Sequence, residues 1–256
     1  MGRRESYTPG TPCWVDLTTP DVDAAEAFYG AVFGWSVREV MPGAYAYFER
    51  DGDVVAGLSP LREEQSAAGM PPSWSMYVRV DDASAAAERA ETLGGTTAVA
   101  PLAIEGAGRM AAVADPGGAV VLLWEPGGFE GAAVVNEDGA WAWNDLQTTD
   151  TEAAAPFYEA LFGWTIAPIP GADGAYSSVA HEGRGIGGVM RATRGITVPY
   201  WTVYFGVANA DTTLEQIAAA GGRVLVEPTA VPAGRFAVAM DPQNAVFCLV
   251  EGEYDA

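Results

Sequence analysis

Histidine is nearly absent from this 256-residue chain, in which His181 is the only one. Metal sites built from several histidines, and a Ser-His-Asp triad at more than one site, are therefore excluded. Cysteine is almost as rare, since the chain has only Cys13 and Cys248. Two thiols make neither a disulfide framework nor a zinc site, so we expect a reducing, cytoplasmic location.

Basic residues are also few. The chain has 13 Lys and Arg residues against 34 Asp and Glu residues, which gives a formal net charge of −21. Such a surface repels phosphate backbones and argues against a nucleic-acid partner. Solubility alone accounts for this acidity, although it also suits a cationic ligand.

Long apolar runs are missing as well. No stretch reaches the roughly 18 apolar residues that a membrane-spanning helix requires. The first ten residues lack the hydrophobic segment of a secretory signal. We therefore expect a soluble protein with no membrane partner.

The sequence does contain an internal repeat. Residues 14–35 and 143–164 are identical at 13 of 22 positions. Further on, Asp115-Pro116 matches Asp241-Pro242 at nearly the same spacing. Repetition at a fixed offset indicates two copies of one unit, and we place the two domains at residues 1–127 and 138–256, joined by a glycine-rich linker.

Each half divides again into two units of the same pattern. A strand is predicted over 12–18, and apolar residues at helical spacing then predict a helix that ends at Gly34. Three short strands separated by turn residues follow this helix. The second quarter repeats the order, so the sequence predicts an α+β protein of four βαβββ modules.

The motifs within this pattern resemble those of a known family. The modules carry Phe28-Tyr29, Phe33-Gly34-Trp35 and Asp115-Pro116-Gly117-Gly118. Together they resemble the vicinal oxygen chelate superfamily, which includes glyoxalase I, extradiol dioxygenases and bleomycin-resistance proteins. The resemblance implies two glyoxalase/bleomycin-resistance-like domains whose curled mixed sheets surround clefts. It leaves open whether modules pair as 1 with 2 and 3 with 4, or crosswise.

The resemblance also implies where metal ligands would stand. Catalytic members place His or Glu on the first and last strands of each module. In this chain those points fall near Trp14, Gly57, Ser75, Leu122, Trp143, Gly188, Thr202 and Cys248. None of these is His, Asp or Glu, so we expect no metal and no cofactor. Metal-dependent glyoxalase or dioxygenase activity is accordingly disfavoured.

Strand alternation instead predicts an aromatic pocket on the inward face. We expect Trp14, Tyr77, Trp143 and Tyr204 to face open space. The alternative is that the tryptophans simply fill the core. The full set of candidate ligand-binding residues is Trp14, Asp16, Ser75, Tyr77, Trp124, Trp143, Asp145, Thr202, Tyr204 and Cys248.

Asp16 and Asp145 have several possible roles. A carboxylate beside a tryptophan is costly to bury unless it is paired. It could serve as the counter-ion of a ligand amine or as a general base. It could equally make a structural hydrogen bond to the backbone or to Arg79.

Three functions remain open from the sequence. The leading hypothesis is a metal-free binding protein of the bleomycin-resistance type. It would hold a planar, and in one version cationic, antibiotic or natural product by stacking and cation–π contact, without chemistry. The second is a metal-independent natural-product pathway enzyme (isomerase, cyclase or hydroxylation-assisting) with Asp16 or Asp145 as acid or base. The third is a scaffold; in each case we expect a monomer or homodimer.

Overall fold

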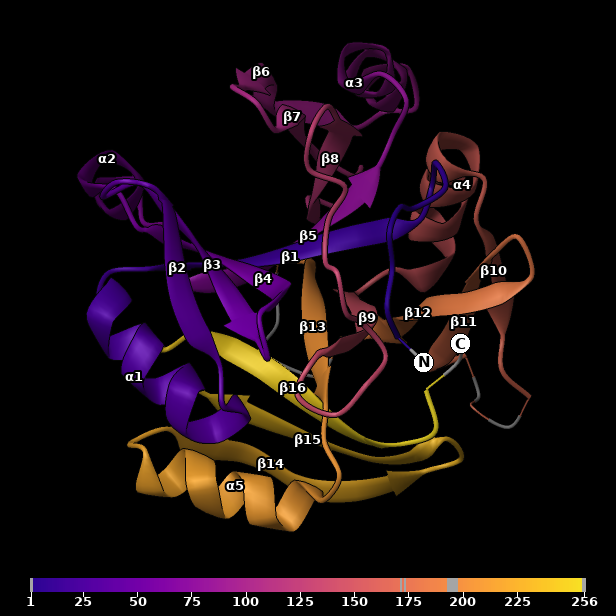
Figure 1. Cartoon of the computed structure of the whole chain (residues 1–256). Coiled ribbons are helices and arrows are strands. Elements are labelled where there is room, and N and C mark those ends of the chain that lie inside the picture. Colours follow the sequence, from indigo (N-terminus) through magenta and orange to yellow (C-terminus); the bar gives the residue numbers. More distant parts are fainter. Residues whose placement is uncertain (1, 171, 173, 193–197, 255–256) are drawn as a thin grey trace.

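Each half of the chain folds into one eight-stranded mixed sheet (Figure 1). The computed structural model describes residues 2–170, 172, 174–192 and 198–254. The first sheet has the strands β1 (Pro12–Thr19), β2 (Ser36–Met41), β3 (Tyr45–Arg50), β4 (Asp53–Pro60), β5 (Ser73–Arg79), β6 (Thr96–Ile104), β7 (Gly108–Ala114) and β8 (Val120–Pro126). Their spatial order is β2-β3-β4-β1-β5-β8-β7-β6.

The second sheet repeats this arrangement as β10-β11-β12-β9-β13-β16-β15-β14. Its strands are β9 (Trp141–Thr148), β10 (Thr165–Pro168), β11 (Tyr176–His181), β12 (Arg184–Arg191), β13 (Tyr200–Gly206), β14 (Arg223–Val231), β15 (Gly234–Met240) and β16 (Val246–Gly252). The helices are α1 (Val22–Phe33), α2 (Glu63–Ala67), α3 (Ala83–Thr92), α4 (Thr151–Phe162) and α5 (Ala210–Ala219).

The predicted α+β class and the four βαβββ modules are confirmed. The short helix α2, in the connection from β4 to β5, was not predicted. Within the first module β1 pairs with β4 in parallel, and β1 also pairs with β5 of the second module antiparallel. The pairing that the sequence left open is therefore 1 with 2, and the same contacts join modules 3 and 4.

The helix ends follow the predicted chemistry. The Asp21 side chain accepts a hydrogen bond from the backbone N–H of Ala24 at the start of α1. The helix stops at Gly34, whose φ of 71° lies in the left-handed region. The tryptophan that follows, Trp35, is buried in the core, and so is its counterpart Trp164.

A buried chain of hydrogen bonds joins the two halves. Trp74 Nε1 donates to Tyr29 Oη at 2.9 Å, and Tyr29 Oη donates to Asp241 Oδ2 of the other half at 3.1 Å. Around this Trp–Tyr–Asp chain α1 packs against α5, and β5 packs against β13. The equivalent chain with the two halves exchanged runs through Trp201, Tyr158 and Asp115, and its donor–acceptor distances are 3.0 Å at both steps.

The same aspartates also hold their turns. Asp115 Oδ1 accepts the backbone N–H groups of Gly117 and Ala119, which leaves Oδ2 for the tyrosine. The Phe-Tyr and Asp-Pro motifs are thus the two sides of the interface between the halves.

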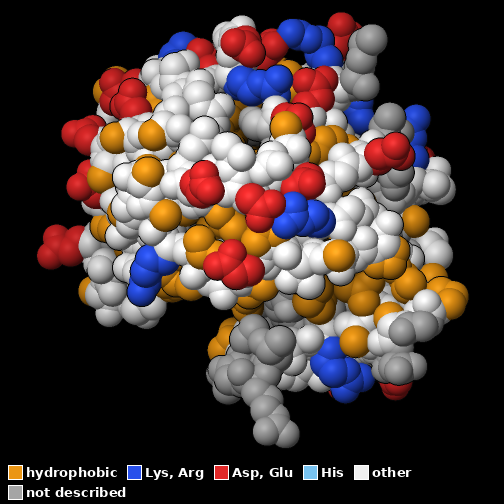
Figure 2. All heavy atoms as spheres, turned by 90° about the horizontal axis from the view of Figure 1, so that it is seen from below, with side chains coloured by type: hydrophobic (Ala, Val, Ile, Leu, Met, Phe, Trp, Pro, Cys, Tyr) orange, Lys and Arg blue, Asp and Glu red, His pale blue; other side chains and the backbone are white. Residues whose placement is uncertain are grey.

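Apart from a few buried aspartates, the charged side chains lie at the surface. Figure 2 shows acidic side chains scattered over one face, with apolar side chains between them, rather than gathered into one patch. Across the described residues, the helices are all too short or too polar to cross a membrane.

Replacing the bridging tyrosines tests the interface. Tyr29→Phe or Tyr158→Phe leaves a buried carboxylate and a buried indole N–H without their shared partner, so we expect each to lower the free energy of unfolding by about 1–3 kcal/mol. Urea denaturation measures this loss. Tyr47→Phe is the matched control, since no hydrogen bond of its hydroxyl is recorded in the described structure; equal losses in all three variants would contradict the assignment.

Candidate functional site

Asp16 lies at the centre of the first sheet, paired with Gly57 on β4 and Ser75 on β5. Its side chain is buried with only 5% exposure for the residue. Two hydroxyls donate to Asp16 Oδ2, that of Tyr77 at 2.7 Å and that of Tyr45 at 3.1 Å. The indole of Trp14 in turn donates to Tyr45 Oη at 2.9 Å. We call this group the first Asp–Tyr cluster.

The second Asp–Tyr cluster repeats these contacts around Asp145, which is 3% exposed. Tyr204 donates to Asp145 Oδ2 at 2.6 Å, and Tyr176 donates to Oδ1 at 2.9 Å. Trp143 Nε1 also donates to Oδ1, at 3.1 Å. Both aspartates therefore have hydrogen-bond partners other than the backbone or Arg79.

Burial sets the protonation of these groups. Desolvation raises the pKa of Asp16 to about 6, against the opposing effect of the hydrogen bonds from Tyr77 and Tyr45. Burial raises the pKa of Asp145 too, for the same reason. Arg79 pairs with Asp81 at 2.6 Å instead of with Asp16. With a pKa of about 6, Asp16 can change protonation just below neutral pH.

A glycine makes room for each outer tyrosine. Tyr45 stands on β3, two strands away from Asp16, and reaches it across Gly57 on the intervening β4. A Cβ at Gly57 would lie 2.1 Å from Tyr45 Oη. Gly188 repeats this arrangement, since its Cβ would lie 2.0 Å from Tyr176 Oη. Tyrosine hydroxyls thus occupy the space in which the family resemblance placed a metal-ligand side chain.

The predicted open space is absent around the first cluster. Trp14 is 3% exposed, because the rings of Phe129 and Tyr47 pack edge-on against it at centroid distances of 4.8 and 5.7 Å. Tyr77 is buried as well, and so is Tyr204 in the second half. The expectation that these three residues face open space is wrong. The Trp14 indole and the Tyr77 and Tyr204 hydroxyls form hydrogen bonds within the two Asp–Tyr clusters. In addition, the linker residue Phe129 covers Trp14 of the first cluster.

The other predicted residues surround the two aspartates. Trp124 is buried beside Tyr77, with ring centroids 6.4 Å apart, and Ser75 is half-buried next to Asp16. Thr202 is buried and pairs with Asp145 across β13 and β9.

Cys248 is buried opposite Tyr204 on β16. Burial raises the pKa of its thiol above the ordinary range. A thiol that stays protonated is a poor nucleophile and a poor metal ligand.

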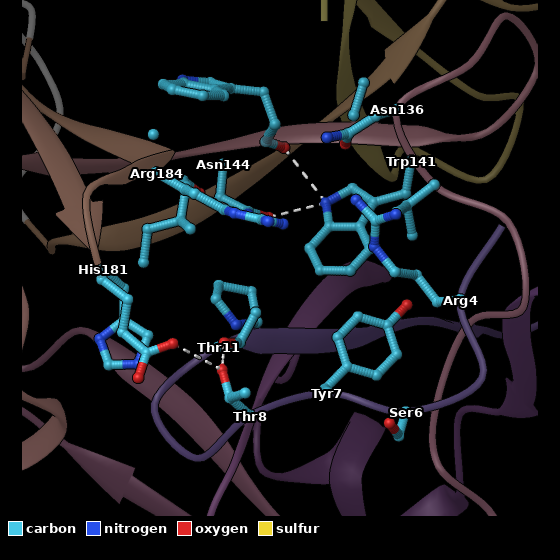
Figure 3. Close-up of a pocket in the computed structure, with 17 residues that line it drawn as sticks. Arg4, Ser6, Tyr7, Thr8, Thr11, Asn136, Trp141, Asn144, His181 and Arg184 are labelled. Carbon is cyan, nitrogen blue, oxygen red and sulfur yellow. Dashed lines mark hydrogen bonds between the residues drawn. The ribbon is translucent and has the colours of Figure 1, made fainter. Parts of the chain in front are cut away.

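Trp143 differs from its counterpart Trp14 because it borders a cavity. The cavity has a volume of about 440 Å³ and lies between the N-terminal segment, the start of β9 and the β11–β12 hairpin (Figure 3). Its lining combines the rings of Tyr7 and Trp141 with polar side chains. Trp143 borders it through its backbone oxygen, which accepts a hydrogen bond from Trp141 Nε1, since its own indole N–H donates to Asp145 and Tyr176 on the opposite face of β9 from Asn144. Among the ten predicted residues, it is Trp143 that the structure places in this lining.

Comparison with known proteins places this geometry in a family. Residues 13–123 match the glyoxalase/bleomycin resistance protein/dioxygenase superfamily, and residues 131–250 match a glyoxalase-like domain. CFP32 of Mycobacterium tuberculosis (strain CDC 1551 / Oshkosh), provisionally named a glyoxylase, is 39% identical, with 98% of each chain covered. The chain belongs to the glyoxalase/bleomycin resistance protein/dioxygenase superfamily.

A further relative and a solved structure are also similar to the chain. The anthracycline biosynthesis protein DnrV of Streptomyces peucetius is 38% identical, over 96% of this chain and 94% of its own length. The crystal structure of the Mn(II)-bound glyoxalase from Novosphingobium aromaticivorans superposes with a TM-score of 0.68 and 16% identity, covering 100% of this chain and 85% of that one. At that identity the likeness concerns the fold alone.

The donor set of this chain does not fit a metal ion at the superfamily's ligand points. Gly57 and Gly188 offer no donor, and tyrosine hydroxyls fill the space beside them. In the described part of the chain, no three His, Cys, Asp or Glu side chains come together. Divalent metals need several such donors at one point.

Filling the glycine space tests the packing of the second cluster. We expect Gly188→Ala to lower the free energy of unfolding by about 1–3 kcal/mol, because its Cβ collides with Tyr176. In Gly188→Ala/Tyr176→Leu the shorter side chain removes the collision, so the double variant should lose less than the sum of the single ones. Strictly additive losses in denaturation would contradict the contact.

The protonation of Asp16 predicts a pH-dependent stability. Since the pKa of Asp16 is raised to about 6 in the fold, the folded state holds a proton between about pH 4 and 6 that the unfolded chain has released. The free energy of unfolding should therefore fall as pH rises through this window, by about 2–3 kcal/mol, and stay level above it.

Asp16→Asn should remove this part of the pH dependence, which denaturation at a series of pH values measures. Glu88→Gln is the control, because it removes one negative charge, as Asp16→Asn does, from an exposed position on α3. Parallel profiles for wild type and Asp16→Asn would contradict the prediction.

Proposed function

We propose that the chain binds a planar aromatic small molecule in the cavity beside Trp143, without a metal. The observation that carries this proposal is the cavity itself. Its volume of about 440 Å³ lies in the range of small-molecule sites. Aromatic walls from Tyr7 and Trp141 suit the flat face of a fused-ring ligand.

The relatives support this class of ligand. DnrV carries the name of an anthracycline biosynthesis protein and matches the chain over nearly its full length. Anthracyclines contain a flat system of fused rings. We therefore infer that the ligand is a polycyclic natural product, held as bleomycin-resistance proteins hold a drug.

The second half is the better candidate for the site. Trp14 of the first half is covered by Phe129 and Tyr47, whereas Trp143 is only half-buried. In this proposal the first Asp–Tyr cluster serves as structure. The second cluster, with Thr202 and Cys248 beside it, holds the strand that carries the cavity wall, because Asp145 fixes the indole of Trp143 while the Trp143 backbone oxygen accepts a hydrogen bond from Trp141.

An enzymatic role is the second candidate, and the state of Asp145 favours it. Its pKa is raised by burial, and tyrosine hydroxyls rather than a cation stabilise it. A buried carboxyl with a raised pKa can hold a proton and pass it on. As an acid or base, Asp145 would serve an isomerisation, a cyclisation or a step that assists hydroxylation. Asp145→Asn would then abolish turnover and leave binding intact.

Binding of 1,4-dihydroxyanthraquinone, a planar fused-ring probe, tests the site. We expect Tyr7→Leu to weaken its binding roughly five- to hundredfold, because base-like stacking on an aromatic is worth about 1–3 kcal/mol. Equilibrium dialysis measures the affinity. Tyr47→Leu is the matched control, since Tyr47 is also half-buried but lies outside the lining, and should bind as wild type; equal weakening in both variants, or no binding by wild type, would overturn the proposal.

A further inference from the structure

Two arginines reach the cavity beside Trp143 from opposite sides. Arg4 comes from the N-terminal segment and Arg184 from the start of β12, and both extend toward Trp141 (Figure 3). All 13 basic residues of the chain are arginines, against 34 acidic residues. Because the protein as a whole is strongly acidic, a cavity lined by two arginines is locally opposite in charge to the rest of the chain.

Neither arginine has an acidic partner in the described structure. Arg4 Nη1 donates to the backbone oxygen of Arg3 at 3.3 Å, and Arg184 forms no ion pair with any residue that is described. Five other arginines of the described chain form ion pairs, as Arg235 does with Asp211 at 2.7 Å. In so acidic a chain, two unpaired guanidinium groups at one cavity leave hydrogen-bond donors available for a ligand.

The remaining polar groups of the lining do not neutralise this charge. Glu182 is the one acidic residue in the described lining, and the hydroxyl of Thr8 donates to its Oε2 at 3.4 Å. Thr8 also shares a hydrogen bond of 2.9 Å with Thr11. His181 lies 2.8 Å from the backbone oxygen of Pro9 through Nε2, which fixes the ring at the edge of the cavity. The balance of formal charge around the cavity is positive.

We propose that this cavity binds an aromatic carboxylate, with its acid group on Arg4 and Arg184 and its ring against Tyr7 and Trp141. A guanidinium presents paired N–H donors that match the two oxygens of a carboxylate. The tryptophan wall supplies the apolar contact that a simple inorganic anion cannot use. This inference rests on the proposed function and fixes the charge of the ligand at this cavity as negative, opposite to the cation that the acidic composition suggested.

Two probes of equal shape separate charge from stacking. Isothermal titration of 2-naphthoate and of the neutral 2-naphthamide into the full-length protein should show the carboxylate binding at least about tenfold tighter at low salt. This preference should shrink as ionic strength rises, because charges near solvent are screened. Equal affinities for the two probes would overturn the inference.

Variants then assign the preference to the cavity. We expect Arg184→Gln or Arg4→Gln to weaken 2-naphthoate binding about tenfold and to leave 2-naphthamide unchanged. Arg191→Gln is the matched control, since Arg191 is an exposed arginine at the other end of β12 and lies outside the lining. Equal weakening by Arg191→Gln would attribute the preference to overall charge and overturn the inference.

The proposed function fails by a different result. If neither naphthalene probe binds, or if Tyr7→Leu leaves the binding of both unchanged, the cavity is not an aromatic site and both proposals fall. If 2-naphthamide binding depends on Tyr7 while 2-naphthoate has no advantage, the cavity remains an aromatic site and only the anion is wrong.

Discussion

The two buried Trp–Tyr–Asp chains hold the rest of the structure in place. Each takes a tyrosine from the first helix of one half and an aspartate from the last turn of the other, so neither half satisfies its own buried polar groups alone. A buried hydroxyl or carboxylate without a partner is costly, and the two halves therefore fold against each other in one fixed arrangement. That arrangement sets the N-terminal segment against β9 and the β11–β12 hairpin, where the cavity lies.

Much of the architecture could be predicted because it depends on local periodicity and on repetition. The alternation of side chains along a strand placed Asp16 on the face of Tyr77, and the structure joins them by a hydrogen bond. Tyr45 could not be found in this way, since its contact with Asp16 crosses a whole strand and exists only because Gly57 has no side chain. The sequence did hold a signal, because the second half has Tyr176 and Gly188 at matching places.

The repeat could not predict how the two halves differ. Phe129 belongs to the linker, which follows the first half only, and its ring covers Trp14. Residues of the N-terminal segment, Arg4 and Tyr7 among them, wall the cavity beside Trp143 of the second half. These differences arise from segments outside the repeated modules. They turn two equivalent clusters into one that is covered and one that borders a cavity.

The two Trp–Tyr–Asp chains exchange equivalent contacts between the halves, which bears on how the molecule arose. Tyr29 meets Asp241 as Tyr158 meets Asp115, which is the exchange of equivalent contacts found across the twofold axis of a symmetric dimer. A single ancestral domain could make both contacts by pairing with a second copy of itself. Fusion of two such genes keeps the old dimer interface inside one polypeptide. It also releases each copy from symmetry, so that one binding surface can be lost while the other evolves.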